Sequence, residues 1–402
     1  MTHDTKRLSQ TEFIALMAMV AATVAFSIDA MLPALPEIGA ELSPDALNNA
    51  QLILTSFVFG MGLGTFVTGP LSDTFGRKPV MIGGAVLYCG AAIWAFYAQT
   101  LEVMLIARTI QGLGAAGPRV VALAMIRDIY GGRDMARISS FVMLVFSLVP
   151  ALAPTLGYFI IAGFGWRSIF LAFVIFSLAT SIWLLIRQPE TLLPENRRPL
   201  RIGKLIEATK EVLTTETTRL SMIVQTLGFG ILFSSLSSIQ QIFDLVFDEG
   251  EHFHYWFGSI AVISASASLL NARIVGKYGM RAIIRRMFQV NITVALFMVA
   301  CQFLGNETVR FWSFYVFVVS CFFGAGMTIG NLNALAMEPL PHIAGLAASA
   351  IAAVATVGAV IIAIPVGLAF NGTPVPLGLA VAVLATIAFW FTTKIKRPSD
   401  KG

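Results

Sequence analysis

The stretch GPLSDTFGRKP at residues 69–79 joins two long apolar segments. Its glycines and prolines predict a tight turn. Asp73 can accept a hydrogen bond from a nearby arginine or from the start of the next helix, and Arg77 and Lys78 suit an anionic lipid surface. A merely basic loop would account for the arginine and the lysine but not for the spaced glycines and aspartate. The stretch therefore predicts a short, structured connection between two membrane-spanning helices.

The composition around this connection indicates a membrane protein. Hydrophobic residues make up 57% of the 402 positions and charged residues only 12%, whereas a soluble domain has roughly a quarter of its residues charged. Apolar runs of about 20 residues recur along the chain, each long enough to cross a hydrocarbon core of ~30 Å. Because a helix satisfies its own backbone hydrogen bonds in lipid, we expect an all-α integral membrane fold. A single soluble core would need amphipathic stripes, which are largely missing.

Twelve apolar segments predict twelve transmembrane helices. They lie near residues 13–34, 50–70, 80–98, 102–126, 137–162, 166–186, 219–243, 254–274, 287–304, 311–336, 343–370 and 375–393. The longest polar stretch follows the sixth segment, and part of it (200–213) has the spacing of an amphipathic surface helix. We therefore expect three parts: a six-helix bundle at 1–186, a cytoplasmic linker at 187–218 and a second six-helix bundle at 219–402.

The basic residues predict an orientation. If both termini are cytoplasmic, all but four of the 27 Lys and Arg residues fall on the inside. Arg167 and Arg310 then lie outside, and Arg108 and Arg119 lie within a span. The outer loops are acidic instead. This asymmetry also explains the basic pI of about 9.2 without nucleic acid as a partner. The first apolar run, residues 13–32, is longer than the core of a signal peptide and is expected to be retained as a span.

No cofactor or metal is expected. The three cysteines, Cys89, Cys301 and Cys321, lie inside apolar stretches without metal-ligand spacing, and the four histidines are scattered. An enzyme in the membrane would need clustered histidines, carboxylates or Ser/His pairs within the spans, and a channel would show repeated pore-lining signatures. Neither pattern occurs in the sequence, so we expect a transporter rather than an enzyme.

The loop at 69–79 resembles the signature of the major facilitator superfamily, G-x-x-x-D-x-x-G-R-[RK]. The fixed positions are Gly69, Asp73, Gly76, Arg77 and Lys78. This resemblance implies twelve transmembrane helices in two six-helix bundles around a central cavity, and it implies alternating access to that cavity. The two halves are expected to be parallel repeats. A weaker copy of the loop, ARIVGKYGMR at 272–281, stands between the eighth and ninth spans, with a glycine in place of the aspartate.

Further stretches are similar to the bicyclomycin/chloramphenicol-resistance (Bcr/CflA) group of drug:H⁺ antiporters. They are IDAMLPALPEI at 28–38, RTIQGLGAA at 108–116, VPALAPTLG at 149–157 and AMEPLPHIAG at 336–345. Met31 stands where that group usually has Tyr, and Ala153 where the antiporter motif often has Gly. The resemblance implies proton-coupled multidrug efflux and antibiotic resistance, a monomer, and multi-pass placement in the bacterial inner membrane. Its partners would be a small-molecule substrate, protons and the lipid bilayer.

Three ionisable residues lie within the expected spans: Asp29, Arg108 and Arg119. Each costs at least ~2.5 kcal/mol at mid-membrane unless it is paired or hydrated, so each is a functional candidate. Asp29 and Arg108 fall in the same outer half, which permits a pair. Burial favours a neutral carboxyl group and a nearby arginine favours a charged one. We expect proton exchange at Asp29, with Arg108 stabilising its deprotonated form. A purely structural ion pair is the alternative.

Other polar residues are candidates to line the substrate cavity. Arg119 falls within about 20° of the helix face that carries Arg108, so it either lines the same aqueous cavity, favouring anionic or strongly polar substrates, or snorkels to the inner interface. The remaining candidates are amides: Gln111, Gln225, Gln240, Asn331 and Asn333. In the antiporter-like motif, Pro150, Pro154 and Gly157 allow close helix packing and bending, and are expected to seal the outer half of the first bundle.

The sequence leaves the substrate open. A dedicated exporter or an importer of a metabolite, such as an amino acid, a peptide or a siderophore, is the alternative to drug efflux. The charge preference of the cavity, the proton stoichiometry and the conformational state are also undetermined by the sequence.

Overall fold

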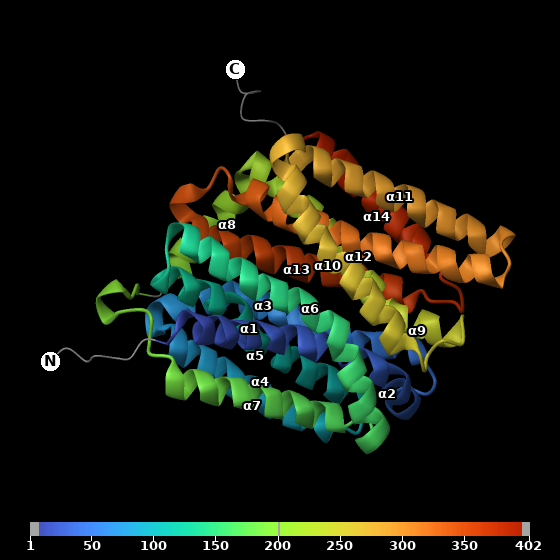
Figure 1. Cartoon of the computed structure of the whole chain (residues 1–402), viewed down its shortest axis with the longest axis horizontal. Helices are drawn as coiled ribbons and strands as arrows, with labels where there is room; N and C mark the ends of the chain where they lie inside the picture. The colour runs from blue at the N-terminus through green and yellow to red at the C-terminus, as the bar shows by residue number, and fades with distance from the viewer. Residues whose placement is uncertain (1–7, 200–201, 396–402) are drawn as a thin grey trace. The chain divides into compact units, whose positions relative to one another are not determined.

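The computed structural model describes residues 8–199 and 202–395, and this part of the chain is helical, without strands (Figure 1). Fourteen α-helices and four short 3₁₀ helices follow one another: α1 (Gln10–Asp29), η1 (Leu32–Ala34), α2 (Leu35–Leu42), η2 (Leu47–Gln51), α3 (Leu52–Phe75), α4 (Arg77–Phe96), α5 (Leu101–Ile129), α6 (Gly132–Phe164), α7 (Ser168–Arg187), η3 (Pro194–Asn196), α8 (Ile202–Thr214), α9 (Glu216–Leu245), α10 (Phe253–Tyr278), α11 (Met280–Leu304), α12 (Glu307–Met337), η4 (Pro341–Ile343), α13 (Ala344–Leu368) and α14 (Val375–Thr393).

Each of the twelve expected spans corresponds to one long helix. Within the described residues, eleven helical segments are long and apolar enough to cross a membrane, by length and composition. The fifth expected span is α6 (Gly132–Phe164), in which Leu148–Phe164 is the apolar stretch found among the described residues. The predicted amphipathic helix in the linker is α8, and its start at Leu200 and Arg201 lies outside the described residues. The prediction of an all-α membrane fold is therefore confirmed.

The first expected span is broken near its C-terminal end. Helix α1 stops at Asp29, and the chain continues through η1 and α2. Pro33 follows Asp29 by four residues. In a continued helix its N–H would donate to the carbonyl of Asp29, but a proline has no N–H to donate. Ala30 still bonds to the carbonyl of Phe26 at 3.1 Å as the last helical contact. The continuous helix expected over residues 13–34 thus ends five residues early, and Asp29 becomes the last residue of α1.

Single glycines make the sharpest connections between spans. Gly76 separates α3 from α4 with φ 105°, and Gly279 separates α10 from α11 with φ 78°. Both angles lie in the left-handed region, which suits glycine because it has no Cβ. The tight turn predicted over residues 69–79 is therefore confined to Gly76. Gly69 and Pro70 continue α3, contrary to the expectation that they form the turn.

Contacts between residues divide the chain into two compact units. The first contains residues 1–34 and 56–202, and the second contains residues 35–55 and 203–402. The start of α3 thus groups with the second unit and the rest of α3 with the first. The expected bundle limits at 186 and 219 stay predictions.

Each unit has an apolar core of its own. In the first, α1, α4, α5, α6 and α7 meet around Phe13, Leu16, Met125 and Ile138. In the second, a smaller cluster joins Ala267 of α10, Ile283 of α11 and Met327 of α12. Many large apolar side chains remain exposed on the outer helix surfaces, among them Ile175, Phe297 and Val383. Such a surface suits lipid, because the hydrocarbon core solvates apolar side chains.

Candidate functional site

Arg108 is the centre of a buried polar cluster in the first unit. It lies on α5 and is completely shielded from solvent. Its Nη2 donates to the carbonyl of Ser27 at 3.1 Å, and its Nη1 donates to Oε1 of Gln111 at 2.7 Å. The guanidinium carbon also lies 4.4 Å from the ring centroid of Phe57, a cation–π distance. The guanidinium is thus fixed by α1, by its own helix and by α3.

A tyrosine joins this cluster from α4. The hydroxyl of Tyr88 hydrogen-bonds to the hydroxyl of Ser27, which donates in turn to the carbonyl of Thr23 at 2.6 Å. Both side chains are buried. Neither Ser27 nor Tyr88 is among the site residues predicted from the sequence. The available signal was a hydroxyl within an apolar span, two residues before Asp29 in the case of Ser27.

Asp29 lies beside this cluster along the chain but is not bonded to it. Its side chain is buried, with 5% of the residue exposed. Among the residues that the structure describes, none donates a hydrogen bond to the Asp29 carboxyl group or forms an ion pair with it. Arg108 contacts the backbone of Ser27, two residues earlier, instead of the carboxylate. The structure therefore does not form the ion pair that the similar depth of Asp29 and Arg108 permits.

Small residues bring the helices around the cluster into close contact. A Cβ on Gly112 of α5 would collide with the carbonyl oxygen of Phe57 on α3. A Cβ on Gly157 of α6 would collide with the carbonyl oxygen of Ala30, the residue after Asp29. Pro150 and Pro154 lie inside α6, about two turns and one turn before this contact, respectively. The antiporter-like motif thus packs α6 directly on the broken end of α1.

Arg77 organises the signature connection at the opposite end of α3. Its Nη1 donates to Oδ1 of Asp73 at 2.5 Å and to Oγ of Ser72 at 2.8 Å, and its Nε donates to Oδ2 of Asp128 at 2.9 Å. The predicted contact between Asp73 and a nearby arginine is therefore present. Asp128, in the last turn of α5, was not selected from the sequence.

Glu190 covers the other side of the same connection. Its carboxylate accepts hydrogen bonds from the backbone N–H groups of Arg77 and Lys78, both at 3.0 Å. These are donors at the start of α4, where a negative charge is favourable. A Cβ on Gly76 would lie 2.6 Å from Oε2 of Glu190. The backbone angle thus requires the signature glycine, and a side chain at this position would also displace the carboxylate of Glu190.

The remaining predicted cavity residues differ in their surroundings. Arg119 is half-buried on α5, and Gln225 and Gln240 are buried on α9. Asn331 is buried, and its Nδ2 donates to Oδ1 of Asn271 on α10 at 2.8 Å. Asn333 is exposed on α12. The structure therefore brings Gln111 to Arg108 and Asn331 to Asn271, and within the described residues no hydrogen bond joins the other predicted amides to one another.

A partly buried amide network lies in the second unit and was not predicted. Gln51 of η2 donates from Nε2 to Oε1 of Gln241 on α9 at 2.5 Å. Gln241 donates to Oδ1 of Asn48 at 2.8 Å, and Asn48 donates to the carbonyl of Phe370 at 2.8 Å. Ser238 also donates to Oε1 of Gln51 at 3.2 Å. These uncharged groups join η2, α9 and the residues after α13.

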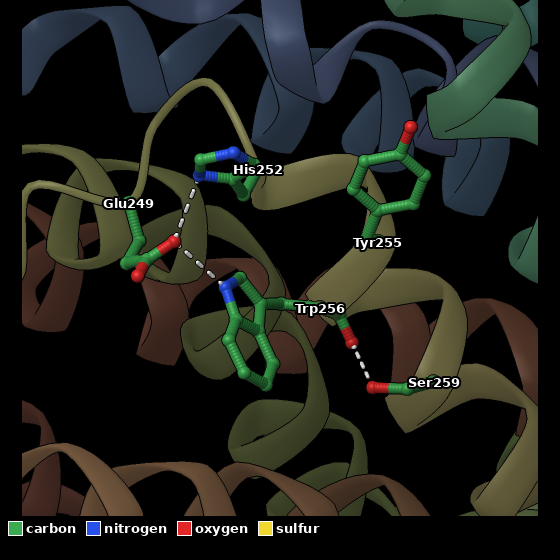
Figure 2. A pocket seen from close by; sticks show the side chains of 5 residues that line it. All are labelled: Glu249, His252, Tyr255, Trp256 and Ser259. Carbon is green, nitrogen blue, oxygen red and sulfur yellow. Dashed lines mark hydrogen bonds and ion pairs between the residues drawn. The ribbon is translucent and has the colours of Figure 1, made fainter.

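The loop between α9 and α10 forms a shallow pocket of about 400 Å³. Figure 2 shows Glu249 between His252 and Trp256: its Oε2 pairs with Nδ1 of His252 at 3.1 Å and accepts from Nε1 of Trp256 at 3.0 Å. Tyr255 and Ser259 complete the lining. The carboxylate orients the indole ring, which packs in an aromatic cluster with Phe243 and other rings of the second unit. We interpret this pocket as a structured end of α10.

Comparison with known proteins identifies the family. Residues 17–363 match the Major Facilitator Superfamily. A bicyclomycin resistance protein homolog of Haemophilus influenzae is 29% identical over 395 residues, 95% of this chain and 96% of that protein. The multidrug resistance protein MdtL of Shewanella oneidensis is 28% identical over 328 residues, 80% of each chain. The crystal structure of a D-xylose-proton symporter covers 97% of this chain and 98% of its own, with a TM-score of 0.78 at 16% identity, a likeness of fold alone.

These comparisons confirm the resemblance on which the sequence analysis relied, both to the superfamily and to the bicyclomycin-resistance group. They also indicate a multi-pass membrane transporter rather than an enzyme. The match spans most of both units and includes Asp29, Arg108 and the signature connection. The chain belongs to the Major Facilitator Superfamily.

Proposed function

We propose that this transporter exports small molecules, with drug-like compounds as the substrate class, in exchange for protons. The names of the similar proteins, a bicyclomycin resistance homolog and a multidrug resistance protein, support efflux. The observation that carries proton coupling is the buried carboxyl group of Asp29, which has no bonding partner in the described part of the chain. A carboxyl group without a fixed counter-ion can change its charge without breaking a structural ion pair.

The cycle that we infer uses Asp29 as the proton carrier. A proton from the outer solution binds a carboxylate oxygen of Asp29 and neutralises it, and the proton leaves toward the cytoplasm when substrate is taken up there. Arg108 acts on this exchange as a fixed positive charge, because Ser27, Gln111 and Phe57 hold its guanidinium. Its position near the end of α1 favours the deprotonated aspartate without a direct bond.

The proposal includes an orientation and a location. Both termini face the cytoplasm of a bacterial cell, the protein lies in the inner membrane, and a monomer is sufficient. The support is the distribution of Lys and Arg, which concentrates them in the connections on one side. In this orientation Arg77, Asp128 and Glu190 lie at the cytoplasmic surface and Asp29 lies nearer the outer one.

Transport in proteoliposomes tests the proposal. An imposed pH gradient is combined with phenicols, fluoroquinolones and amphipathic cations, and substrate-induced proton flux is measured. The wild type should move protons against the direction of the substrate. Asp29→Asn should abolish this flux, because an amide cannot carry the proton, whereas Glu37→Gln, at an exposed carboxyl group on α2, should stay within about twofold of the wild type.

Two outcomes would contradict the proposal. Full proton-driven transport by Asp29→Asn would remove the coupling role of that residue. Movement of substrate and proton in the same direction would replace antiport by symport. The same vesicles, loaded with amino acids, dipeptides or siderophores, distinguish a drug exporter from a dedicated metabolite transporter.

A further inference from the structure

A groove of about 720 Å³ lies in the second unit, between α10, α11 and α14. Its position is at one end of all three helices: Tyr278 ends α10, Arg285 lies in the second turn of α11, and Thr393 ends α14. Helices α11 and α14 pack closely, whereas α10 packs mainly on α12. Figure 1 shows α10 and α11 running apart from the end at which they are joined, and the residues that line the groove lie toward that end.

One end of the groove is polar and positively charged. Arg285, Arg286 and Gln289 line it from α11, and Tyr278 lines it from α10 with 58% of its surface exposed. Both arginines are exposed, and neither pairs with a carboxylate among the described residues. Among the described residues, the one hydrogen-bond partner of the Arg286 guanidinium is the amide of Gln289, at 3.5 Å. Two adjacent positive charges thus line the groove without a counter-ion from the described part of the chain.

The other end of the groove is apolar. Leu270 and Ile274 of α10 and Phe323 and Met327 of α12 line it. Leu270 precedes Tyr278 by two turns, so the apolar surface extends about 12 Å along the helix from the polar end. Only 17% of the apolar window of α10 is buried, the smallest share among the eleven candidate spans. At the groove, Leu270 itself is 42% exposed, so this apolar surface of α10 is partly uncovered by the described chain.

We propose that this groove binds one anionic phospholipid of the inner leaflet. The phosphate pairs with Arg285 and Arg286, and an acyl chain lies along Leu270, Ile274 and Phe323. Charge complementarity selects this occupant, because a basic pocket between transmembrane helices on the cytoplasmic side suits an anionic headgroup. The charge distribution of the sequence predicts that this end of the helices is cytoplasmic. A lipid there would hold α10 to α11 at the place where protein contacts between them are few.

Native mass spectrometry of the full chain in detergent tests the proposal, with phosphatidylglycerol and phosphatidylcholine of identical acyl chains as probes. The wild type should bind one phosphatidylglycerol in preference to phosphatidylcholine. Arg285→Gln with Arg286→Gln should weaken phosphatidylglycerol binding about thirtyfold, the effect of two basic residues at an anionic surface. Arg219→Gln with Arg273→Gln removes the same charge from exposed positions outside the groove and should change binding less than twofold.

A second variant tests the space of the groove independently of its two positive charges. Ala282 lines the groove, so Ala282→Phe fills it while both arginines remain, and it should also reduce phosphatidylglycerol binding. The proposal is overturned if the Arg285/Arg286 variant binds like the wild type, or if phosphatidylcholine binds equally well. It is also overturned if inorganic phosphate or a transported substrate displaces the lipid, because the groove would then be an anion site or a substrate entrance. Size-exclusion chromatography identifies any variant that has not folded. If one of the two groove variants fails in this way, lipid binding by the other one tests the proposal.

Discussion

Arg77 and Asp128 form an ion pair of 2.9 Å that joins the first turn of α4 to the last turn of α5. The second unit contains a related pair, in which Arg281 of α11 lies 3.4 Å from Glu338 at the end of α12. In each unit an arginine near the start of a helix, just after a one-glycine connection, binds a carboxylate at the end of the helix that follows. The degenerate copy of the signature has lost its aspartate but keeps this contact, which is consistent with the expected repeat of the two halves.

The two pairs should differ in strength. The Arg77 and Asp128 side chains are 9% and 17% exposed, against 22% and 40% for Arg281 and Glu338. Asp128→Asn should therefore lower the stability by about 1–3 kcal/mol and slow transport, because a buried guanidinium loses a partner. Glu338→Gln should cost at most about 1 kcal/mol. Thermal unfolding in detergent and the transport assay measure both, and equal losses would contradict this ranking.

Gly157 should tolerate no side chain. In Gly157→Ala the new methyl group meets the carbonyl of Ala30, so α6 or the end of α1 must shift and proton-coupled transport should fall at least about tenfold, the cost of misplacing the exchanging group. Gly163→Ala is the control on the same helix, because nothing lies within 4 Å of its added Cβ. Transport by Gly157→Ala at the rate of Gly163→Ala would show that this contact does not position Asp29.

Arg119 should influence which substrates are exported. It is half-buried, and within the described residues it has no hydrogen-bond or ionic partner. If it lines the substrate path, Arg119→Gln should raise the KM of anionic substrates by about tenfold and leave that of cationic ones unchanged or lower, since one charge–charge contact is lost. Arg119→Lys should retain the preference. If neither variant alters the ratio of the two KM values, the arginine snorkels to the interface and has no role in selection.

Asn331 should act as a packing residue rather than a substrate ligand. Its amide bonds to Asn271 at 2.8 Å and to the carbonyl of Met327 at 2.9 Å. A double-mutant cycle with Asn271→Ala and Asn331→Ala should give a coupling energy of about 0.6 kcal/mol, typical of polar contacts between transmembrane helices. KM should change little. A KM increase of tenfold or more in Asn331→Ala alone would restore the cavity role that the sequence analysis assigned to it.

The sequence was most informative where interactions are local. The length of the apolar runs located all twelve long helices. Asp73 and Arg77 are four residues apart and Arg108 and Gln111 three, so each pair lies on neighbouring turns, and the structure shows a hydrogen bond within each pair. The same reasoning could not find Asp128 or Glu190. Asp128 and Glu190 are 51 and 113 residues from Arg77 in the sequence. No local sequence pattern specifies which distant carboxylate contacts Arg77.

Long-range contacts also explain what the sequence missed in the amides. Gln51 and Gln241 lie 190 residues apart, so neither one alone indicates the network that they form. Asn331 was expected to line a cavity because polar residues in a span are functional candidates. The structure adds a partner on another helix, Asn271, and the cavity role of Asn331 stays a prediction. A polar residue within a span therefore needs its partner identified before a role can be assigned.

The proline that ends α1 has an effect on the charge beside Asp29. In an unbroken helix the carbonyl of Ser27 would also accept the N–H of Met31. The helix ends at Asp29 instead, and Arg108 donates to this carbonyl. In Pro33→Ala the helix could continue, and Met31 and Arg108 would then share the two lone pairs of one oxygen. The break in α1 thus leaves more of the hydrogen-bonding capacity of Ser27 to a charged side chain from another helix.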